Sequence, residues 1–161
     1  MTPLWTIYES SLLGPLTLVG DDHGLSRLLF SDSTPRLSDA GRDPAPFSAA
    51  TRQLSEYFRG LRRSFELDLA LGGTPFQREV WKRLTAIPYG DTVSYTELAT
   101  SVGRPHSVRA VAGAVARTPI PVVIPCHRVV GVNGALTGYL GGLRRKAALL
   151  SLERRAVGTP P

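Results

Sequence analysis

The chain has 161 residues, 42% of them hydrophobic, which is enough to build a core without help from metals or disulfides. Nineteen Lys and Arg residues stand against 13 Asp and Glu, a formal charge of +6 that favours either a polyanionic partner or a generic basic surface. A single cysteine excludes an internal disulfide and a cysteine-rich zinc site.

The sequence has neither of the features that would predict membrane insertion or secretion. No stretch approaches the roughly 18 apolar residues of a membrane span. The first ten residues show neither a basic leader nor an apolar core of a signal peptide. We therefore expect a cytoplasmic protein with no membrane association. The lack of a coiled-coil pattern favours a monomer with no obligate protein partner.

Residues 1–72 are predicted to form a small sheet-and-helix domain. Apolar segments at 4–8, 16–19 and 25–30 are separated by turn signals, which predicts an antiparallel sheet. A flexible surface loop is expected over about 31–46, where Ser, Asp, Pro and Arg follow no period. A helix is predicted over 48–59. The alternation of Phe65, Leu67 and Leu69 then predicts another strand.

A second domain is predicted over residues 73–157, followed by a disordered tail at 158–161. Thr74 and Pro75 are typical residues for the N-cap and first turn of a helix, which then continues to about Leu84. A last helix is predicted over 142–155.

Two short helices, predicted over 94–102 and 107–117, are joined by a turn and form a helix-turn-helix candidate, although simple packing would also produce such a pair. In the second helix an inward stripe is expected, formed by Val108, Val111, Ala112 and Val115. The opposite face would hold Ser107, Ala110, Ala114 and Arg117. Small residues permit close approach to a minor groove, whereas long polar side chains read the major groove. DNA bound here should therefore be read with little sequence specificity.

Cys126 follows the apolar run at 121–124 and precedes His127 and Arg128. A thiolate is the attacking species, so a reactive cysteine needs a base or a positive charge nearby. On an extended segment neighbouring side chains point to opposite faces, and His127 could then take the proton through a water. For a bare Cys-His pair, the alternative is a buried structural cysteine beside a surface histidine.

Five short motifs occur together in a characteristic order: Pro75-Phe76-Gln77, Tyr89-Gly90, Ser94-Tyr95, Arg109-Ala110-Val111 and Ile124-Pro125-Cys126-His127-Arg128-Val129. Through them, residues 74–155 closely resemble the O6-alkylguanine-DNA alkyltransferase family, also called methylated-DNA–protein-cysteine methyltransferases. The N-terminal half resembles the family's variable domain more loosely. The resemblance implies an α+β fold, in which a small antiparallel-sheet domain precedes a helical, winged helix-turn-helix-like domain that binds DNA and carries the active site.

The resemblance also implies a single-use DNA repair enzyme. Such a protein flips a damaged guanine out of duplex DNA and transfers the O6-alkyl group irreversibly to its own cysteine, without a cofactor. O4-alkylthymine is a weaker candidate substrate. The partner is double-stranded DNA, approached from the minor groove, and clustering of copies along DNA is left open.

The resemblance assigns three catalytic residues. Cys126 is the alkyl acceptor, His127 takes the thiol proton through a water, and Glu153 is the carboxylate that orients this histidine. In the predicted final helix Glu153 lies beside the apolar stripe of Leu149 and Leu150. Without the resemblance, a solvent-exposed acid at a helix end would be the preferred interpretation, because arginines surround it at 144, 145, 154 and 155.

Substrate and DNA contacts follow from the same resemblance. Tyr95 contacts the target nucleotide through its hydroxyl, and Tyr139 closes the guanine pocket. The amide of Leu140 donates toward O6, and the carbonyl of Val129 accepts from the exocyclic amine. Arg109 is the finger that fills the space of the extruded base. It lies on the DNA-binding face with Ser107 and Ala110.

Two features depart from the family. Thr118 stands where the family commonly has asparagine, which puts in doubt a side-chain bond that holds the turn near the cysteine. Some relatives carry zinc in the N-terminal domain, but His23 and one distant cysteine give no such cluster here, so we expect a metal-free domain.

Two other classes of function are compatible with parts of the pattern. A damage sensor would use the same fold without chemistry, although sensors of this kind lack the cysteine. A cysteine hydrolase with a Cys-His-Glu triad would need a cleft for a small molecule or peptide and repeated turnover. Turnover separates the three classes: none for the sensor, one for the transferase and many for the hydrolase.

Overall fold

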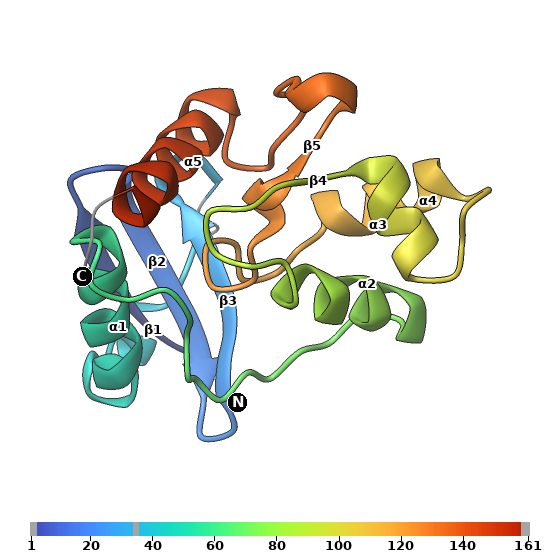
Figure 1. The fold of residues 1–161 in the computed structure, drawn as a ribbon. Helices are drawn as coiled ribbons and strands as arrows, with labels where there is room; N and C mark the ends of the chain where they lie inside the picture. The colour runs from blue at the N-terminus through green and yellow to red at the C-terminus, as the bar shows by residue number, and fades with distance from the viewer. Residues whose placement is uncertain (1–2, 34–35, 159–161) are drawn as a thin grey trace. The chain divides into compact units, whose positions relative to one another are not determined.

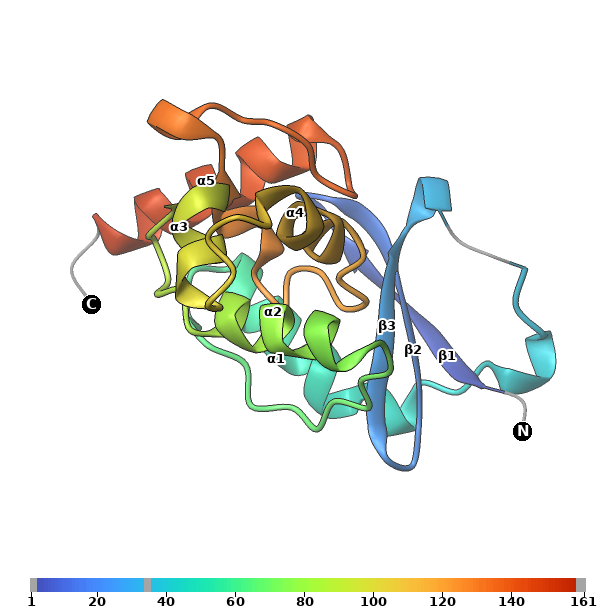
Figure 2. The ribbon, with the colours of Figure 1, turned by 90° about the vertical axis from the view of Figure 1, so that its right-hand side faces the viewer.

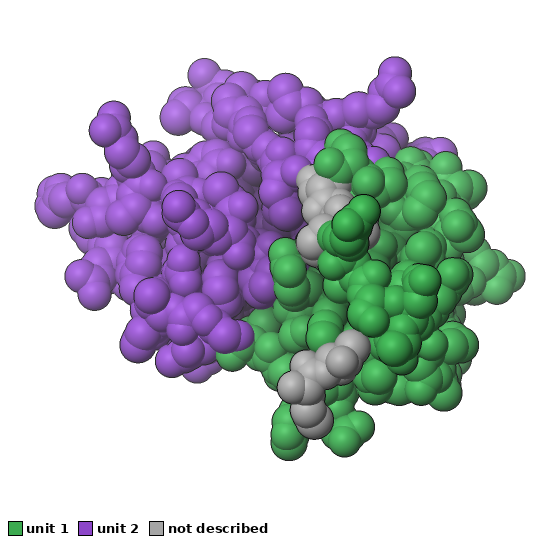
Figure 3. All heavy atoms as spheres, turned by 180° about the vertical axis from the view of Figure 1, so that it is seen from behind, with its two compact units in different colours: residues 1–71 green, residues 72–161 purple. Residues whose placement is uncertain are grey.

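The computed structural model describes residues 3–33 and 36–158 and divides the chain into two compact units, residues 1–71 and 72–161 (Figure 3). Unit 1 holds a three-stranded antiparallel sheet and unit 2 is mainly helical (Figure 1), which confirms the predicted α+β class. Across the described residues, no helix has the length and apolar composition needed to cross a bilayer.

The sheet of unit 1 is a meander of β1 (Leu4–Ser10), β2 (Gly14–Asp21) and β3 (Gly24–Phe30). Its strands pair in chain order because tight turns join them, and a bulge between Val19 and Gly20 shifts the register of β2 against β3. Helix α1 (Ser48–Phe58) contacts β1, and its Leu54 and Tyr57 are fully buried.

The strand predicted around Phe65–Leu69 is wrong. Only one bridge forms there, between Leu25 and Leu69. The backbone of Glu66 is instead satisfied by the side chain of Gln53, whose Nε2 donates to the Glu66 carbonyl at 3.0 Å and whose Oε1 accepts from its N–H at 2.9 Å. At Glu66 an amide side chain therefore takes the place of a neighbouring strand, whereas Leu25 of β3 donates to the Asp68 carbonyl at 2.9 Å and accepts from the Ala70 N–H at 2.8 Å.

The segment predicted as a flexible loop contains three 3-10 turns, at 31–33, 39–41 and 45–47. Its later part is fixed to β1 by two hydrogen bonds of Trp5. The indole Nε1 donates to the Ser38 carbonyl at 2.8 Å, and the backbone carbonyl of Trp5 accepts from the Asp43 N–H at 2.9 Å. Of the predicted tail at 158–161, only Gly158 is described, as the C-cap of the last helix; the rest lies outside the described residues.

Unit 2 contains α2 (Pro75–Thr85), α3 (Tyr95–Ser101), α4 (Val108–Ala116) and α5 (Leu143–Val157), with the short parallel strands β4 (Val93–Ser94) and β5 (Val129–Val130). Helices α2 and α3 each begin with a full capping box, in which the side chains of Thr74 and Ser94 accept from the third residue of the helix. Helices α2, α3 and α4 pack against one another (Figure 2).

The inward face of α4 differs from the predicted stripe. Ala114, expected on the outer face, is buried together with Val111 and Val115, and its carbonyl accepts from Trp81 Nε1 at 2.9 Å. These three residues follow the i, i+3, i+4 spacing of one helical face. Val108 and Ala112, predicted to point inward, are only half-buried, because they lie at the edge of this face.

Candidate active site

Cys126 lies in a buried 3-10 turn, Cys126–Arg128, rather than on the expected extended segment. The chain reaches it through a tight turn at 121–124, where Val122 adopts a left-handed conformation with a φ of 74°. This conformation is rare for a β-branched residue and marks a strained backbone. The N–H of Cys126 then donates to the Ile124 carbonyl at 2.7 Å, so the position of the sulfur is set by backbone contacts on its N-terminal side.

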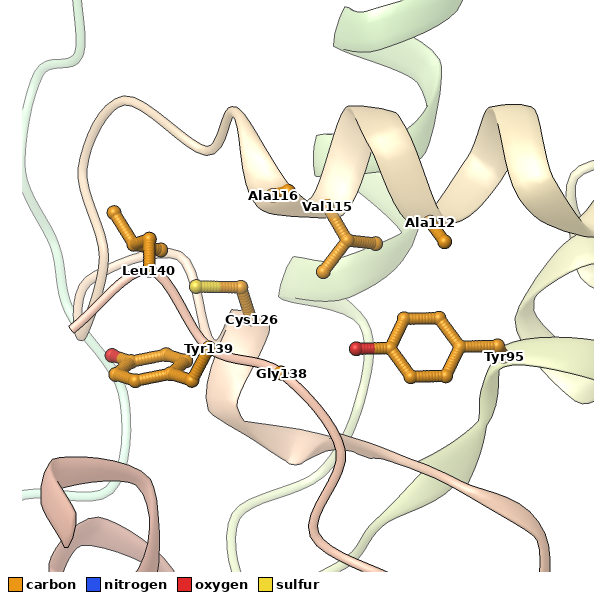
Figure 4. Close-up of a pocket in the computed structure, with 8 residues that line it drawn as sticks. All are labelled: Tyr95, Ala112, Val115, Ala116, Cys126, Gly138, Tyr139 and Leu140. Carbon is orange, nitrogen blue, oxygen red and sulfur yellow. The ribbon is translucent and has the colours of Figure 1, made fainter. Parts of the chain in front are cut away.

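A pocket of about 330 Å³ opens onto the sulfur of Cys126 (Figure 4), near the lower limit of about 300 Å³ for ligand sites. Its walls come from α4, from the start of α3 and from the irregular segment before α5. Most of the lining is apolar, with two tyrosine hydroxyls. The lining residues are Tyr95, Ala112, Val115, Ala116, Cys126, Gly138, Tyr139 and Leu140.

The neighbouring His127 is fully buried and pairs with Glu153 of α5. Its Nε2 lies 2.7 Å from Oε2 of Glu153, and both side chains are almost completely shielded from solvent. Glu153 is therefore a core residue and not the exposed helix-end acid that its neighbouring arginines suggested. Among the described residues, Nδ1 of His127 has no hydrogen-bond partner in the protein.

The carboxylate of Glu153 also accepts hydrogen bonds from Arg128 and from the backbone of Gly90. Arg128 donates through Nε to Oε1 at 2.8 Å and through Nη2 to Oε2 at 3.0 Å, and the Gly90 N–H donates to Oε1 at 3.2 Å. Burial alone would raise the pKa of Glu153, but the hydrogen bonds and charges of His127 and Arg128 outweigh burial and lower it to about 2. The group is thus an anion that can only accept hydrogen bonds.

Burial shifts the pKa values of Cys126 and His127 in opposite directions, and both shifts favour the neutral form. Burial raises the pKa of the Cys126 thiol to about 12, opposed only in part by hydrogen bonds that include the Thr118 and Tyr139 side chains and by the charge of Lys146. Burial lowers the pKa of His127, although Glu153 opposes this change. A protonated thiol therefore lies beside a neutral imidazole, so attack by the sulfur requires transfer of its proton to a base.

Among the expected substrate contacts, Tyr95, Tyr139 and Leu140 line the pocket. Burial raises the pKa of Tyr95, which keeps its hydroxyl protonated, and that hydroxyl donates to the Thr137 carbonyl at 3.2 Å. The structure does not bring Val129 into the lining. Its carbonyl accepts from the buried Nζ of Lys146, which also donates to the Gly138 carbonyl at 3.1 Å.

The expected DNA contacts lie outside the pocket. Arg109 and Ala110 are exposed in the first turn of α4, and Ser107 is half-buried at its N-cap. Further along the same helix, Ala112, Val115 and Ala116 form a wall of the pocket, so α4 joins the exposed face to the sulfur. Unit 2 holds 12 Lys and Arg against 4 Asp and Glu, whereas residues 1–71 hold 7 against 9, so the positive charge of the chain belongs to unit 2.

Comparison with known proteins agrees with this division. A family model described as 6-O-methylguanine DNA methyltransferase, DNA binding domain, matches residues 75–155, and the model of the ribonuclease-like domain of that enzyme matches residues 4–71. The chain belongs to the 6-O-methylguanine DNA methyltransferase family.

Relatives from Mycobacterium and Bacillus are named methylated-DNA–protein-cysteine methyltransferases. The chain is 47% identical to the methylated-DNA–protein-cysteine methyltransferase of Mycobacterium tuberculosis H37Rv over 146 residues, which is 89% of this chain and 88% of the relative. It is 42% identical to the constitutive enzyme of Bacillus subtilis, over 88% of this chain and 90% of the relative. The crystal structure of Mycobacterium tuberculosis OGT in complex with DNA has a TM-score of 0.88 at 45% identity, covering 94% of this chain and 93% of that one.

In this methyltransferase-family chain, the sequence analysis did not predict that two cationic side chains near the site are buried. The sequence analysis gives Arg128 no role beyond its place after His127 and does not single out Lys146, yet both are buried. A charged residue inside an otherwise apolar helical face was the only available signal for Lys146. The doubt about Thr118 is also answered in part: this buried hydroxyl donates to the Val115 carbonyl at 2.7 Å and so fixes the turn after α4.

Proposed function

We propose that this chain repairs DNA directly, by transferring the alkyl group of O6-alkylguanine in duplex DNA to Sγ of Cys126, once per molecule. The enzyme class follows from family membership, since the matched relatives are named methylated-DNA–protein-cysteine methyltransferases. One observation carries the assignment to this site: the sulfur of Cys126 faces a pocket next to a buried His127–Glu153 pair.

The chemistry begins with removal of the thiol proton. Nδ1 of His127 accepts this proton through a water, and the imidazolium that forms is stabilised by Glu153, which accepts from Nε2. Sγ then attacks the alkyl carbon as the carbon–O6 bond breaks, and the electron pair of that bond passes to the departing guanine. The resulting thioether is stable, so the protein is not regenerated.

Stabilisation of the leaving guanine comes from donors that line the pocket. The N–H of Leu140 donates to no other group of the described chain and is available to O6. The hydroxyl of Tyr95 turns from the Thr137 carbonyl toward N3 of the bound base. Because Val129 already accepts from Lys146, its carbonyl would offer its second lone pair to the exocyclic amine.

Base flipping is required because the sulfur lies at the base of a pocket and cannot reach a stacked O6 group in line. We propose that α4 enters the minor groove, with Arg109 filling the space of the extruded base. The exposed small side chain of Ala110 and the half-buried Ser107 allow close approach and give little sequence specificity.

O4-alkylthymine would fit the same chemistry as a weaker substrate. The protein is proposed to act as a monomer in the cytoplasm.

The test is the intact mass of the protein after incubation with duplex DNA that contains O6-methylguanine, followed by peptide mapping. A single added methyl group on Cys126, saturating at one per protein, is expected. Cys126→Ser should abolish transfer and retain DNA binding. An unchanged mass with tight binding to the lesion would favour a sensor, and repeated turnover would favour a hydrolase.

Arg109 is tested with two substrates. Arg109→Ala should slow transfer from duplex DNA far more than transfer from the free base O6-benzylguanine, because a finger acts only on the duplex. Equal loss on both substrates would contradict this role. Exposed Arg83 of α2 offers a matched control, and Arg83→Ala should leave the ratio of the two rates unchanged.

A further inference from the structure

The guanidinium of Arg128 has no part in the steps above, although it is buried and each of its three nitrogens donates a hydrogen bond. Two of its nitrogens bind the two oxygens of Glu153, and Nη1 donates to the Ile87 carbonyl at 2.7 Å. Its cation lies over the ring of Tyr89, 5.5 Å from the ring centroid. Neutralising the charge of Arg128 would need only a nearby carboxylate, whereas this two-nitrogen contact, here called the fork of Arg128, also fixes the geometry of Glu153.

We propose that Arg128 is a positioning residue of the transfer reaction, which holds Glu153 in one orientation and shares its charge so that His127 stays neutral with Nδ1 free to accept the thiol proton. This inference rests on the proposed function. It adds a role for the residue that directly follows His127 in the chain.

The orientation follows from the geometry of the carboxylate. The fork of Arg128 binds both oxygens, at 2.8 and 3.0 Å, so the carboxylate cannot rotate about its terminal bond. Oε2 is then held 2.7 Å from Nε2 of His127. Because the ionised carboxylate only accepts, Nε2 must carry the hydrogen, which leaves the lone pair of the neutral ring on Nδ1.

Among the described residues, three ionisable groups act on the pKa of His127: Glu153 and Lys146 from α5, and Arg128 from the same turn as the histidine. Cys126 precedes His127 in the chain as a neutral thiol. Glu153 favours the imidazolium, whereas Arg128 and Lys146 oppose it. Without Arg128, the full charge of Glu153 would act on the ring. More of the histidine would then already carry a proton, and such a ring cannot take one from the thiol.

Two substitutions separate the charge of Arg128 from its fork. Arg128→Lys keeps the charge and loses the bidentate contact, whereas Arg128→Met removes both. Arg154→Met is the matched control, because it removes an exposed arginine next to Glu153 on the same helix. The single-turnover rate of methyl transfer from duplex DNA would be measured for each protein from pH 5 to 9.

For Arg128→Met, the acidic limb of the pH–rate profile should move to higher pH and the rate should recover in alkaline buffer. For Arg128→Lys, the limb should stay near the wild-type position while the rate falls by roughly 10- to 100-fold at every pH, as expected for a loosened catalytic geometry. The control should follow the wild type. An unmoved limb in Arg128→Met would overturn the charge argument, and a wild-type rate in Arg128→Lys would overturn the role of the fork.

Nitrogen-15 NMR of the DNA-free protein keeps the inference testable if Arg128→Met does not fold or if no transfer occurs. The chain has only three histidines, so the ring signals of His127 are readily assigned with a His127→Gln reference. The wild type should show the Nε2–H form, and Arg128→Lys should show exchange broadening or a mixture with the other tautomer. An Nδ1–H form in the wild type would refute the proposal. Absence of a methyl group on wild-type Cys126 would instead refute the proposed function.

Discussion

Replacing Glu153 by glutamine tests the buried ion network independently of DNA. Lowering the pKa of this carboxyl from 4.5 to about 2 corresponds to about 3 kcal/mol of unfolding free energy, at about 1.4 kcal/mol per pH unit. Since the folded-state pKa is depressed, this stability is complete above about pH 5 and is lost as the pH falls toward 2. Glu153→Gln also leaves the buried cation of Arg128 unpaired. The expected loss at pH 7 is therefore about 3–5 kcal/mol.

Urea unfolding of both proteins at pH 7 and pH 3 would measure this effect. The chain has two tryptophans, Trp5 in unit 1 and the buried Trp81 in unit 2, so a Trp5→Phe background makes the fluorescence report on unit 2 alone. The exposed acid Glu79 provides the matched control, and Glu79→Gln should change the stability by less than about 0.5 kcal/mol at either pH.

The gap between wild type and Glu153→Gln should be large at pH 7 and should shrink clearly at pH 3, where the wild type has itself begun to lose the contribution. The reasoning fails if the gap is the same at both pH values, or if Glu153→Gln is as stable at pH 7 as the Glu79→Gln control.

Three further predictions concern other parts of the chain. Thr118→Val should slow alkylation of Cys126 by iodoacetamide at pH 8 by about tenfold. The hydroxyl donates to the Val115 carbonyl while the thiol is protonated and lowers the thiol pKa by turning to the sulfur as the thiolate forms, and a hydrogen bond to a charged group contributes about 1.5 kcal/mol. Thr118→Ser should react at nearly the wild-type rate, and equal rates for all three proteins would contradict this. Gly90→Ala should lower the unfolding free energy by about 1–3 kcal/mol in urea, because Gly90 has a φ of 84° and its Cβ would lie 2.5 Å from Cγ2 of Val157. Purified protein should contain no stoichiometric zinc by plasma mass spectrometry; a molar ratio near one would refute the metal-free expectation.

Local signals in the sequence predicted much of the fold. The capping residues Thr74 and Ser94 each begin a helix, because a side-chain oxygen and a glutamine or glutamate three residues later satisfy the free N–H groups without help from the rest of the protein. Phe65, Leu67 and Leu69 show the opposite case. Their alternation is typical of a strand, but backbone pairing with β3 is limited to Leu25, which bonds to Asp68 and Ala70, and the side chain of Gln53 satisfies Glu66 instead.

The candidate site was less accessible to sequence reasoning. Apart from the family resemblance, the signals for Glu153 conflict, because Leu149 and Leu150 place it beside an apolar stripe whereas the neighbouring arginines favour a solvent-exposed helix end. Its burial depends on Arg128 and Gly90, which lie 25 and 63 residues away in the chain. Arginine and lysine are usually exposed, so burial of Arg128 and Lys146 contradicts their most common behaviour. Only the three-dimensional arrangement shows the acceptors that make such burial favourable.

The buried thiol of Cys126 has a consequence for the lifetime of the protein before it meets a lesion. With a pKa of about 12, only about one molecule in 10⁵ carries a thiolate at pH 7. Peroxides and stray electrophiles react with thiolates, so the resting sulfur is shielded from the oxidants that inactivate exposed, acidic cysteines. In an enzyme that reacts once, accidental modification of the acceptor cysteine inactivates the molecule permanently. A thiol that stays protonated at rest thus keeps the stored protein intact until it is used.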